Sequence, residues 1–380
     1  MTHLKFNRRS FLLNAVLPAI VAFTGASAIG NVRADNDDYR GGRVYTATNA
    51  VAGNEIVIYH RAANGSLSPA GRLATNGLGS GGGLGNQGGL IGSKNGRWLF
   101  AVNAGSNEIS VFSVRRGNLS LTDKIPSGGT RPVSLTIHGD LLYVLNGGGT
   151  NNITGFTIGE WGQLTPIPNS TQLLSAAATG PAQIQFTPDG DALVVTEKAT
   201  NKIDIYAVED GVANGPAVRD SNGITPFGFA FDKRGHLIVS EAFGGAPSQA
   251  ALSSYEVADD TSNIKVISPS VKDNQSAACW VVVTKNGRYA YTTNTASGSV
   301  SGYRVAKDGK LTLLGDGLTA ITGAGSGPID AALSKSSQFL YVLNGGIGTV
   351  NGYRVEANGS LSPIGNVGGL PPGTNGLIAN

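Results

Sequence analysis

The sequence predicts an all-β protein, a single seven-bladed β-propeller of four-stranded antiparallel blades, from three observations. Glycine is abundant, with 56 of 380 residues, and charged residues make up only 14%, which is typical of many short strands joined by tight turns. One phrase recurs seven times along the chain. The last residues of the chain resemble a strand that the first copy of this phrase lacks.

The repeated phrase contains an apolar strand, a glycine turn, "LYVLN" or a variant, a short polar loop, "I-x-x-Y" and another glycine turn before "LSP". The fifth position of "LYVLN" marks each copy, and these landmarks are separated by 54, 43, 51, 44, 53 and 50 residues. This is the period of a four-stranded propeller blade, and seven copies favour one closed ring over two domains. The landmarks are Asn49, Asn103, Asn146, Glu197, Glu241, Asn294 and Asn344.

Turn residues and the chain ends complete this prediction. "NG" at Asn95-Gly96 and "DG" at Asp189-Gly190 lie between apolar segments, as hairpin turns do. The first copy begins at "RVYTATN" without an inner strand, whereas the final "GTNGLIAN" matches the inner-strand segment "NQGGLIGS" of the second copy. We therefore expect residues 376–379 to form the inner strand of the first blade, which removes the open sheet edge.

The first residues read as an export signal. Residues 1–34 have a charged start, a modest apolar stretch and small residues at A-x-A-like positions, and Arg8-Arg9 followed by "SFLL" resembles a twin-arginine motif. We expect cleavage after Ala34, with Ala28 as the second choice. An ordinary secretory signal with an incidental arginine pair is the alternative. The apolar run is short and interrupted, so it predicts no membrane span.

The export signal divides the chain into a leader at 1–34, a linker at 35–42 and the propeller at 43–380. It predicts a periplasmic or secreted protein. Export permits disulfides, but Cys279 is the only cysteine, so packing and strand pairing must hold the fold together.

The net charge of +3 belongs to the leader. Residues 1–34 contain four basic residues and no acidic one, so the remainder has 24 basic and 25 acidic residues, a net charge of −1. This balance predicts no nucleic-acid partner. We expect a monomer that binds a small molecule.

Candidate site residues follow from the meander. The start of the first strand and the end of the second lie on the same face of each blade, so they line one mouth of the central funnel. The second-strand ends are the seven landmarks named above. The first-strand starts are Gln87, Arg131, Gln183, Phe227, Cys279, Trp280, Asp330 and Asn375.

Two of the landmarks break the repeat. An asparagine at a strand end caps the following turn through its side chain, whereas glutamate is one methylene longer and makes this bond less well. Glu197 and Glu241 lie in neighbouring blades, where their carboxylates can work as a general acid and base on one ligand. The alternative is that each glutamate pairs with a neighbour such as Lys198 or Lys202 and caps its loop.

The other funnel residues have less specific roles. Arg131 can hold a carboxylate or phosphate, and Phe227 and Trp280 can stack on a ring-shaped ligand or pack between blades. Asp330 is a weaker acid candidate. Gln87, Gln183 and Asn375 complete the predicted ligand contacts.

Cysteine and histidine chemistry is disfavoured. Cys279 has no histidine placed to activate it, which indicates a small buried residue. His60, His138 and His236 map to the face opposite the mouth, so a His-based triad or metal site is not expected. No metal and no cofactor is predicted.

The run "NGLGSGGGLGNQGGLIG" contains G-x-G-x-x-G. It links two antiparallel blades and opens no helix, so it is not a dinucleotide-binding fingerprint. We expect a loop over the funnel instead.

The blade repeat, seen most clearly in "LYVLN", "SVSGYRVAKDGKL" and "TVNGYRVEANGSLSPIG", resembles the seven-bladed propeller lactonases. This family includes 6-phosphogluconolactonase and the fungal 3-carboxymuconate lactonizing enzyme, and the resemblance covers residues 43–380. It implies a propeller with histidine, arginine and glutamate in the funnel. The inner-strand starts of this chain contain no histidine, so no catalytic histidine is carried over.

These observations predict an exported hydrolase or lyase acting on a small lactone, sugar-acid or aromatic-acid ligand in the funnel. Arg131 would hold the anionic group, Glu197 or Glu241 would act as general base, and Lys198 would stabilise developing negative charge. A non-catalytic propeller that binds a protein or small molecule is the alternative. A third hypothesis, a cation held by glutamates and asparagines, requires carboxylates nearer the axis than the second strands.

Overall fold

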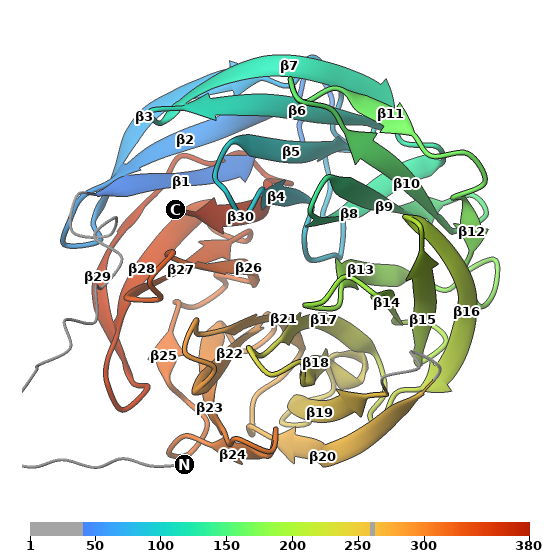
Figure 1. Cartoon of the computed structure of the whole chain (residues 1–380). Coiled ribbons are helices and arrows are strands. Elements are labelled where there is room, and N and C mark those ends of the chain that lie inside the picture. Colours follow the sequence, from blue (N-terminus) through green and yellow to red (C-terminus); the bar gives the residue numbers. More distant parts are fainter. Residues whose placement is uncertain (1–40, 259–262) are drawn as a thin grey trace, which may run out of the picture. The chain divides into compact units, whose positions relative to one another are not determined.

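The computed structural model describes residues 41–258 and 263–380, so the predicted leader at 1–34 and most of the predicted linker lie outside the described residues. The described chain forms seven antiparallel sheets that follow one another around a common centre (Figure 1). The predicted seven-bladed propeller is therefore confirmed. The described part of the chain contains no helix with the length and apolarity that a membrane crossing requires.

Four strands form the main path of each sheet. From the centre outward, blades 1 to 4 contain β30 (Asn375–Ala379), β1 (Gly42–Ala47), β2 (Glu55–Arg61) and β3 (Leu67–Ala74); β4 (Leu90–Gly92), β5 (Trp98–Asn103), β6 (Glu108–Arg115) and β7 (Asn118–Pro126); β8 (Thr130–His138), β9 (Leu141–Gly148), β10 (Asn152–Ile158) and β11 (Leu164–Pro166), with β12 (Gln172–Leu173) also on β10; and β13 (Pro181–Phe186), β14 (Ala192–Glu197), β15 (Lys202–Glu209) and β16 (Val212–Asp220).

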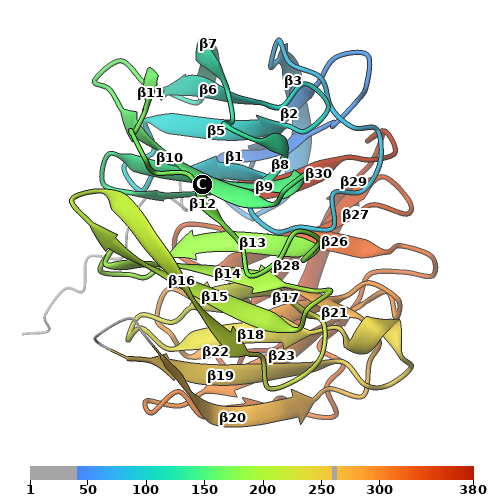
Figure 2. The ribbon, with the colours of Figure 1, turned by 90° about the vertical axis from the view of Figure 1, so that its right-hand side faces the viewer.

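The remaining three blades repeat this order, and in the side view β17, β18, β19 and β20 follow one another from the centre to the rim (Figure 2). Blades 5 to 7 contain β17 (Pro226–Phe231), β18 (Leu237–Glu241), β19 (Ala251–Val257) and β20 (Ile264–Lys272); β21 (Ala278–Val283), β22 (Tyr289–Asn294), β23 (Ser299–Val305) and β24 (Leu311–Leu313), with β25 (Ala320–Ile321) also on β23; and β26 (Pro328–Leu333), β27 (Phe339–Asn344), β28 (Thr349–Val355) and β29 (Leu361–Val367). A short 3-10 helix, Phe243–Gly245, lies between β18 and β19.

Position in the blade explains the sequence of each strand. The second strands, such as β14 with "ALVVTE", are buried along their whole length because the neighbouring blades cover both faces. The outermost strand β7 instead alternates exposed and half-buried residues, as expected where one face meets solvent. The core therefore lies between adjacent blades.

A tyrosine in the second strand joins several blades to the next one. Tyr143 donates its hydroxyl to the carbonyl of Gly211 at 2.8 Å, and Tyr341 donates to Gly65 at 2.7 Å. Both glycines lie in the turn between the third and fourth strands of the following blade and have positive φ. The tyrosine of "LYVLN" thus packs its ring between two blades and bonds its hydroxyl to a turn of the next blade.

The ring closes through its last strand. β30 pairs antiparallel with β1, in a register that sets Tyr45 opposite Ile378 and Thr46 opposite Leu377. This agrees with the predicted closure at 376–379, with the strand starting one residue earlier at Asn375.

Two faces of the ring matter for the site. We call the face where inner strands begin and second strands end the mouth face. The opposite face, which carries the inner-to-second strand turns at 93–96, 138–140, 187–190, 232–235, 284–287 and 334–337, is the turn face.

Candidate functional site in the central channel

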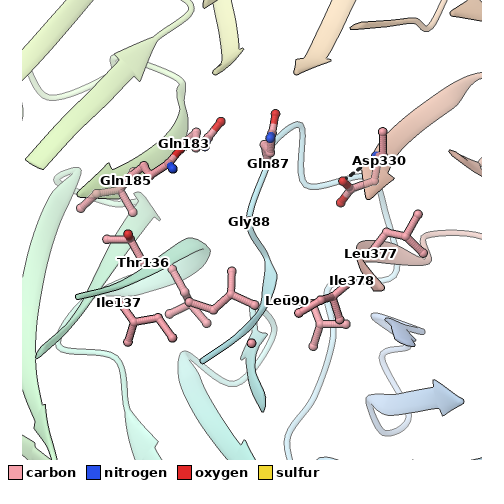
Figure 3. A pocket seen from close by; sticks show the side chains of 15 residues that line it. Gln87, Gly88, Leu90, Thr136, Ile137, Gln183, Gln185, Asp330, Leu377 and Ile378 are labelled. Atoms are coloured by element: carbon pink, nitrogen blue, oxygen red, sulfur yellow. Dashed lines mark hydrogen bonds between the residues drawn. The ribbon is translucent and has the colours of Figure 1, made fainter. Parts of the chain in front are cut away.

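Residues of the inner strands and of the loop before β4 line an open cavity of ≈ 310 Å³ at the centre of the ring. Blades 1, 2, 3, 4 and 7 contribute its walls, and Figure 3 shows Gln87 and Gly88 between Gln183 on one side and Asp330 on the other. The lining residues are Gln87, Gly88, Leu90, Ile91, Gly92, Leu135, Thr136, Ile137, Gln183, Ile184, Gln185, Asp330, Ala331, Leu377 and Ile378.

The glycine-rich loop between β3 and β4 crosses the channel at the mouth face. Gln87 donates its main-chain N–H to Ala182 of blade 4 at 3.0 Å, and Trp280 of blade 6 donates its indole N–H to the carbonyl of Asn86 at 2.6 Å. Asn375 of blade 1 donates to the Asn86 side chain at 2.8 Å. The loop is therefore bonded to blades on several sides of the opening and covers the predicted mouth.

Glycine is required where this loop passes closest to the inner strands. A Cβ at Gly89 would lie 2.5 Å from Oδ1 of Asn375, and Gly88 has a φ of +84°. A side chain at either position would push the loop away from the channel. The glycine run thus allows close backbone approach, and the expected loop over the funnel is present.

Gln87 and Gln183 use their amides to join inner strands. The Gln87 side chain donates to the carbonyl of Val281 at 2.8 Å and accepts from its N–H at 3.0 Å. Gln183 forms the same pair with Phe229, at 2.9 Å and 2.7 Å. Both side chains line the cavity, but no local sequence pattern indicates that their polar atoms bond to the protein's own backbone.

Asp330 is the only ionisable residue in the described lining of the cavity. Its side chain is 3% exposed, and Oδ1 accepts from the N–H of Ala331 at 2.8 Å. Burial raises the pKa of this carboxyl well above its usual value, although N–H groups of Ala331 and Leu377 act in the opposite direction. The channel therefore holds a carboxyl group whose surroundings favour the protonated form, which can donate a hydrogen bond or a proton.

Lys198 and Arg131 lie at the mouth face and do not line the cavity. Lys198 donates to the carbonyls of Gly85 in the glycine-rich loop and of Pro181, and its Nζ lies 4.6 Å from the centre of the Phe227 ring. Burial lowers the pKa of Lys198 to about 8; the nearby Cys279 opposes this shift, whereas Arg131 adds to it. Lys198 thus fastens the loop over the channel.

Phe227 and Trp280 pack beneath the loop. Their ring centres are 5.0 Å apart, and they form a buried cluster with Ala182, Ala242 and Cys279. Cys279 is a buried free thiol, as expected, and burial raises its pKa to about 11. This arrangement favours the packing alternative for both aromatic residues.

Glu197 and Glu241 are fully buried and do not line the cavity. Glu241 accepts hydrogen bonds from the N–H of Gly223 at 2.8 Å and from the hydroxyls of Ser253 and Ser270, both at 2.5 Å. Burial raises the pKa of Glu241, and these three donors partly offset the shift. The carboxylate is enclosed by its own blade.

Glu197 is enclosed in the same way. It accepts from the N–H and the hydroxyl of Ser175, at 3.1 Å and 2.5 Å, and from the hydroxyl of Thr200. In an asparagine blade, Asn103 accepts from Thr75 at the equivalent place, at 2.7 Å. The glutamates therefore bond to the loop that precedes each inner strand, which favours the capping alternative over an acid–base pair facing one ligand.

Sequence reasoning missed Asp204, the buried partner of Glu197. Ser175 donates its N–H to Oδ2 of Asp204 at 3.1 Å, and Oδ1 meets no N–H or O–H donor among the described residues. Burial, followed by the hydrogen bond and charge of Glu197, raises the pKa of Asp204 to about 8. Protonated Asp204 can donate a hydrogen bond to the carboxylate of Glu197, which gives both side chains a partner. The available signal was an acid in "KIDIY", where the other blades have Val, Ser, Thr or Asn.

Comparison with known proteins places this fold. The model of a family described as lactonase, 7-bladed beta-propeller, matches residues 51–178 and 238–328, which is more than half of the chain. The chain belongs to this lactonase family. A search of curated proteins found no significant match.

Solved structures agree with this lactonase propeller at low identity. A putative 6-phosphogluconolactonase from Bacteroides fragilis is 20% identical with a TM-score of 0.70, covering 90% of this chain and 98% of that one. A periplasmic gluconolactonase from Pseudomonas aeruginosa is 15% identical with a TM-score of 0.70, covering 89% and 99%. Virginiamycin B lyase from Staphylococcus aureus is 13% identical with a TM-score of 0.52, covering 74% and 85%. These structures share the fold.

Proposed function

We propose that this protein is an exported lactonase-like hydrolase whose channel binds a small lactone of a sugar acid or related acid. Membership of the lactonase family supports the reaction class. The observation that carries the proposal is Asp330, a buried carboxyl with a raised pKa that lines a cavity of ≈ 310 Å³. This volume suits a ligand with one ring.

Asp330 would act as a general acid. Water adds to the carbonyl carbon of the lactone, which places negative charge on the carbonyl oxygen; the bond to the ring oxygen then breaks, and this oxygen takes the proton of Asp330. The proton lost by the attacking water restores the carboxyl. A protonated carboxyl within hydrogen-bonding reach can neutralise this charge as it forms. Thr136 and Gln185 line the same cavity and add polar atoms that can orient the lactone.

The mouth-face residues would control entry. Lys198 is bonded to Gly85, so opening of the glycine-rich loop must break this contact. Arg131 is half-buried on the same face and would attract the anionic group of a ligand. In this proposal Lys198 stabilises the closed loop and the ligand's negative charge rather than a reacting atom.

The experiment is a lactone panel that includes gluconolactone, assayed with the parent and two variants. Asp330→Asn should abolish most turnover, because Asn fills the same space without a transferable proton. Asp273→Asn is the matched control, since Asp273 is also fully buried with a raised pKa but does not line the channel cavity. Equal turnover by the parent and the Asp330→Asn protein excludes the proposed acid.

A non-catalytic propeller is the second candidate. The amides of Gln87 and Gln183 and the carboxylates of Glu197 and Glu241 all bond within the protein, which favours a rigid binding scaffold. In this case no lactone is hydrolysed, and a panel ligand instead raises the melting temperature of the parent protein.

Export is part of the proposal and is tested separately. We propose twin-arginine export to the periplasm, on the basis of Arg8-Arg9 in the leader. The exported protein is proposed to be a monomer. Replacement of both arginines by lysine should retain the protein in the cytoplasm, as measured by cell fractionation. Unchanged export of this variant indicates the ordinary secretory route.

A further inference from the structure

A second cavity, of ≈ 970 Å³, lies on the turn face. Blades 6, 7, 1 and 2 surround it, and it meets the channel cavity at Ile378, which lines both. We call it the basic cavity. Its lining residues are Gly41, Gly42, Arg43, His60, Ser93, Lys94, Asn95, Gly96, Val114, Arg116, Gly117, Lys285, Lys335, Ile378, Ala379 and Asn380.

The side chains of the basic cavity carry one sign of charge. Arg43, Lys94, Arg116, Lys285 and Lys335 bring five formal positive charges, and no aspartate or glutamate belongs to the described lining. The whole chain has a net charge of only +3, so this concentration does not follow from a basic composition. The described lining therefore carries charge of one sign, although Lys285 and Lys335 also interact with other groups of the protein.

The blade repeat places three of these cations. The turns "SKNG" at 93–96, "TKNG" at 284–287 and "SKSS" at 334–337 occupy the same position in blades 2, 6 and 7, each with lysine second. Ser93 donates to Asn95 at 2.7 Å and the N–H of Gly96 donates to Ser93 at 2.8 Å, which orders the turn around Lys94. In blade 5 the equivalent residue is Lys233, which does not line the cavity, and in blade 4 it is Pro188. The turns of blades 2, 6 and 7 thus bring three lysines to the same cavity.

We propose that the basic cavity binds a small oxyanion with several negative charges, such as a polycarboxylate or a phosphate ester. Arginine and lysine side chains on opposing walls match several anionic groups at once. The volume is that of a small-molecule pocket rather than of a groove for a polymer. This site is separate from the proposed lactone chemistry, and its test does not depend on hydrolysis.

Calorimetric titration of the full chain with inorganic pyrophosphate and with citrate tests this site, because the two probes distinguish phosphate from carboxylate ligands. Binding of at least one probe should show a dissociation constant below about 1 mM at low salt and should weaken as salt is added. Sucrose, which is uncharged, should not bind.

Charge reversal locates the binding. Lys94→Glu with Arg116→Glu changes two exposed side chains of the cavity and should weaken binding by about tenfold or more. Lys307→Glu is the matched control, because Lys307 is exposed in the strand-three-to-four turn of blade 6, as Arg116 is in blade 2, but does not line the cavity. Thermal melts of each variant then check that it folds.

The protein's own acidic residues require one further arm. Asp35, Asp37 and Asp38 precede Gly41 closely in the sequence, so the titration is repeated with asparagine at these three positions. The site is supported if the protein with the three asparagines binds a probe and the Lys94→Glu, Arg116→Glu double change weakens this binding, whether or not the parent also binds. Absence of binding to both proteins, or equal weakening by Lys307→Glu, overturns the proposal.

Discussion

Deletion of residues 373–380 removes the strand that closes the ring. β30 supplies the innermost strand of blade 1 and pairs with Val44, Tyr45, Thr46 and Ala47 of β1. Leu377 is 6% exposed and belongs to the core between blades 7 and 1. Arg61, which is fully buried, also bonds the main-chain oxygen of Asn380 through its guanidinium at 3.0 Å.

The expected loss of stability is large. Burial of one leucine contributes about 1.5–3 kcal/mol, and each buried main-chain group left without a partner costs about 1–3 kcal/mol. Leu377 and only two orphaned groups of β1 together amount to about 4–9 kcal/mol, before the loss at Arg61 is included. Typical unfolding free energies are about 5–15 kcal/mol. The truncated chain should therefore be unfolded or close to unfolding at room temperature.

Thermal melts followed by circular dichroism measure this effect. The full chain should show one cooperative transition, and the truncated chain should lose it or melt far lower. A synthetic peptide of residues 373–380 should restore the transition by pairing with β1, whereas the same peptide with Leu377→Asp should not. A truncated protein that melts like the parent refutes the closure energetics.

Two further predictions concern the buried carboxyl groups. The pKa of Asp204 rises from 3.8 to about 8 on folding, so its contribution to stability is complete below its unfolded pKa and is lost as pH rises through about 8; Asp204→Asn should flatten the decrease in melting temperature between pH 5 and pH 9, and parallel curves for parent and variant would contradict the buried proton. Glu241→Gln should lower the unfolding free energy by about 1–3 kcal/mol, because one oxygen that accepts a hydrogen bond is replaced by an NH₂ group that donates. Lactone turnover per folded molecule should not change. Lost turnover at an unchanged melting temperature would instead make Glu241 catalytic.

The repeat made the ring predictable from sequence. The landmark spacing and the "NG" and "DG" turns identify the blades, because every blade packs between two others and therefore repeats the same apolar strands and turn residues. The match of "GTNGLIAN" to "NQGGLIGS" identified β30 for the same reason. Local sequence patterns are therefore enough to predict the parts of the fold that repeat from blade to blade.

The chemistry of the site depends on contacts that no local pattern encodes. The side-chain amide of Gln87 bonds Val281 and that of Gln183 bonds Phe229, each in a different blade. Only the assembled ring shows that these amides already have hydrogen-bond partners within the protein. Glu197 and Glu241 were recognised as exceptions, but their role depends on the loops that contain Ser175 and Gly223. Asp330 was a weak candidate in the sequence because burial and the surrounding cavity, rather than its neighbours in the chain, make it distinctive.

The pH dependence of kcat/KM for the best lactone tests the central claim most directly. If Asp330 donates a proton from its buried position, activity should be highest while this carboxyl is protonated and should fall as pH rises through its raised pKa. Asp330→Asn should remove this alkaline limb together with most of the activity, while Asp273→Asn should retain both. Activity that rises with pH in the parent, or an unchanged profile in Asp330→Asn, would contradict the account.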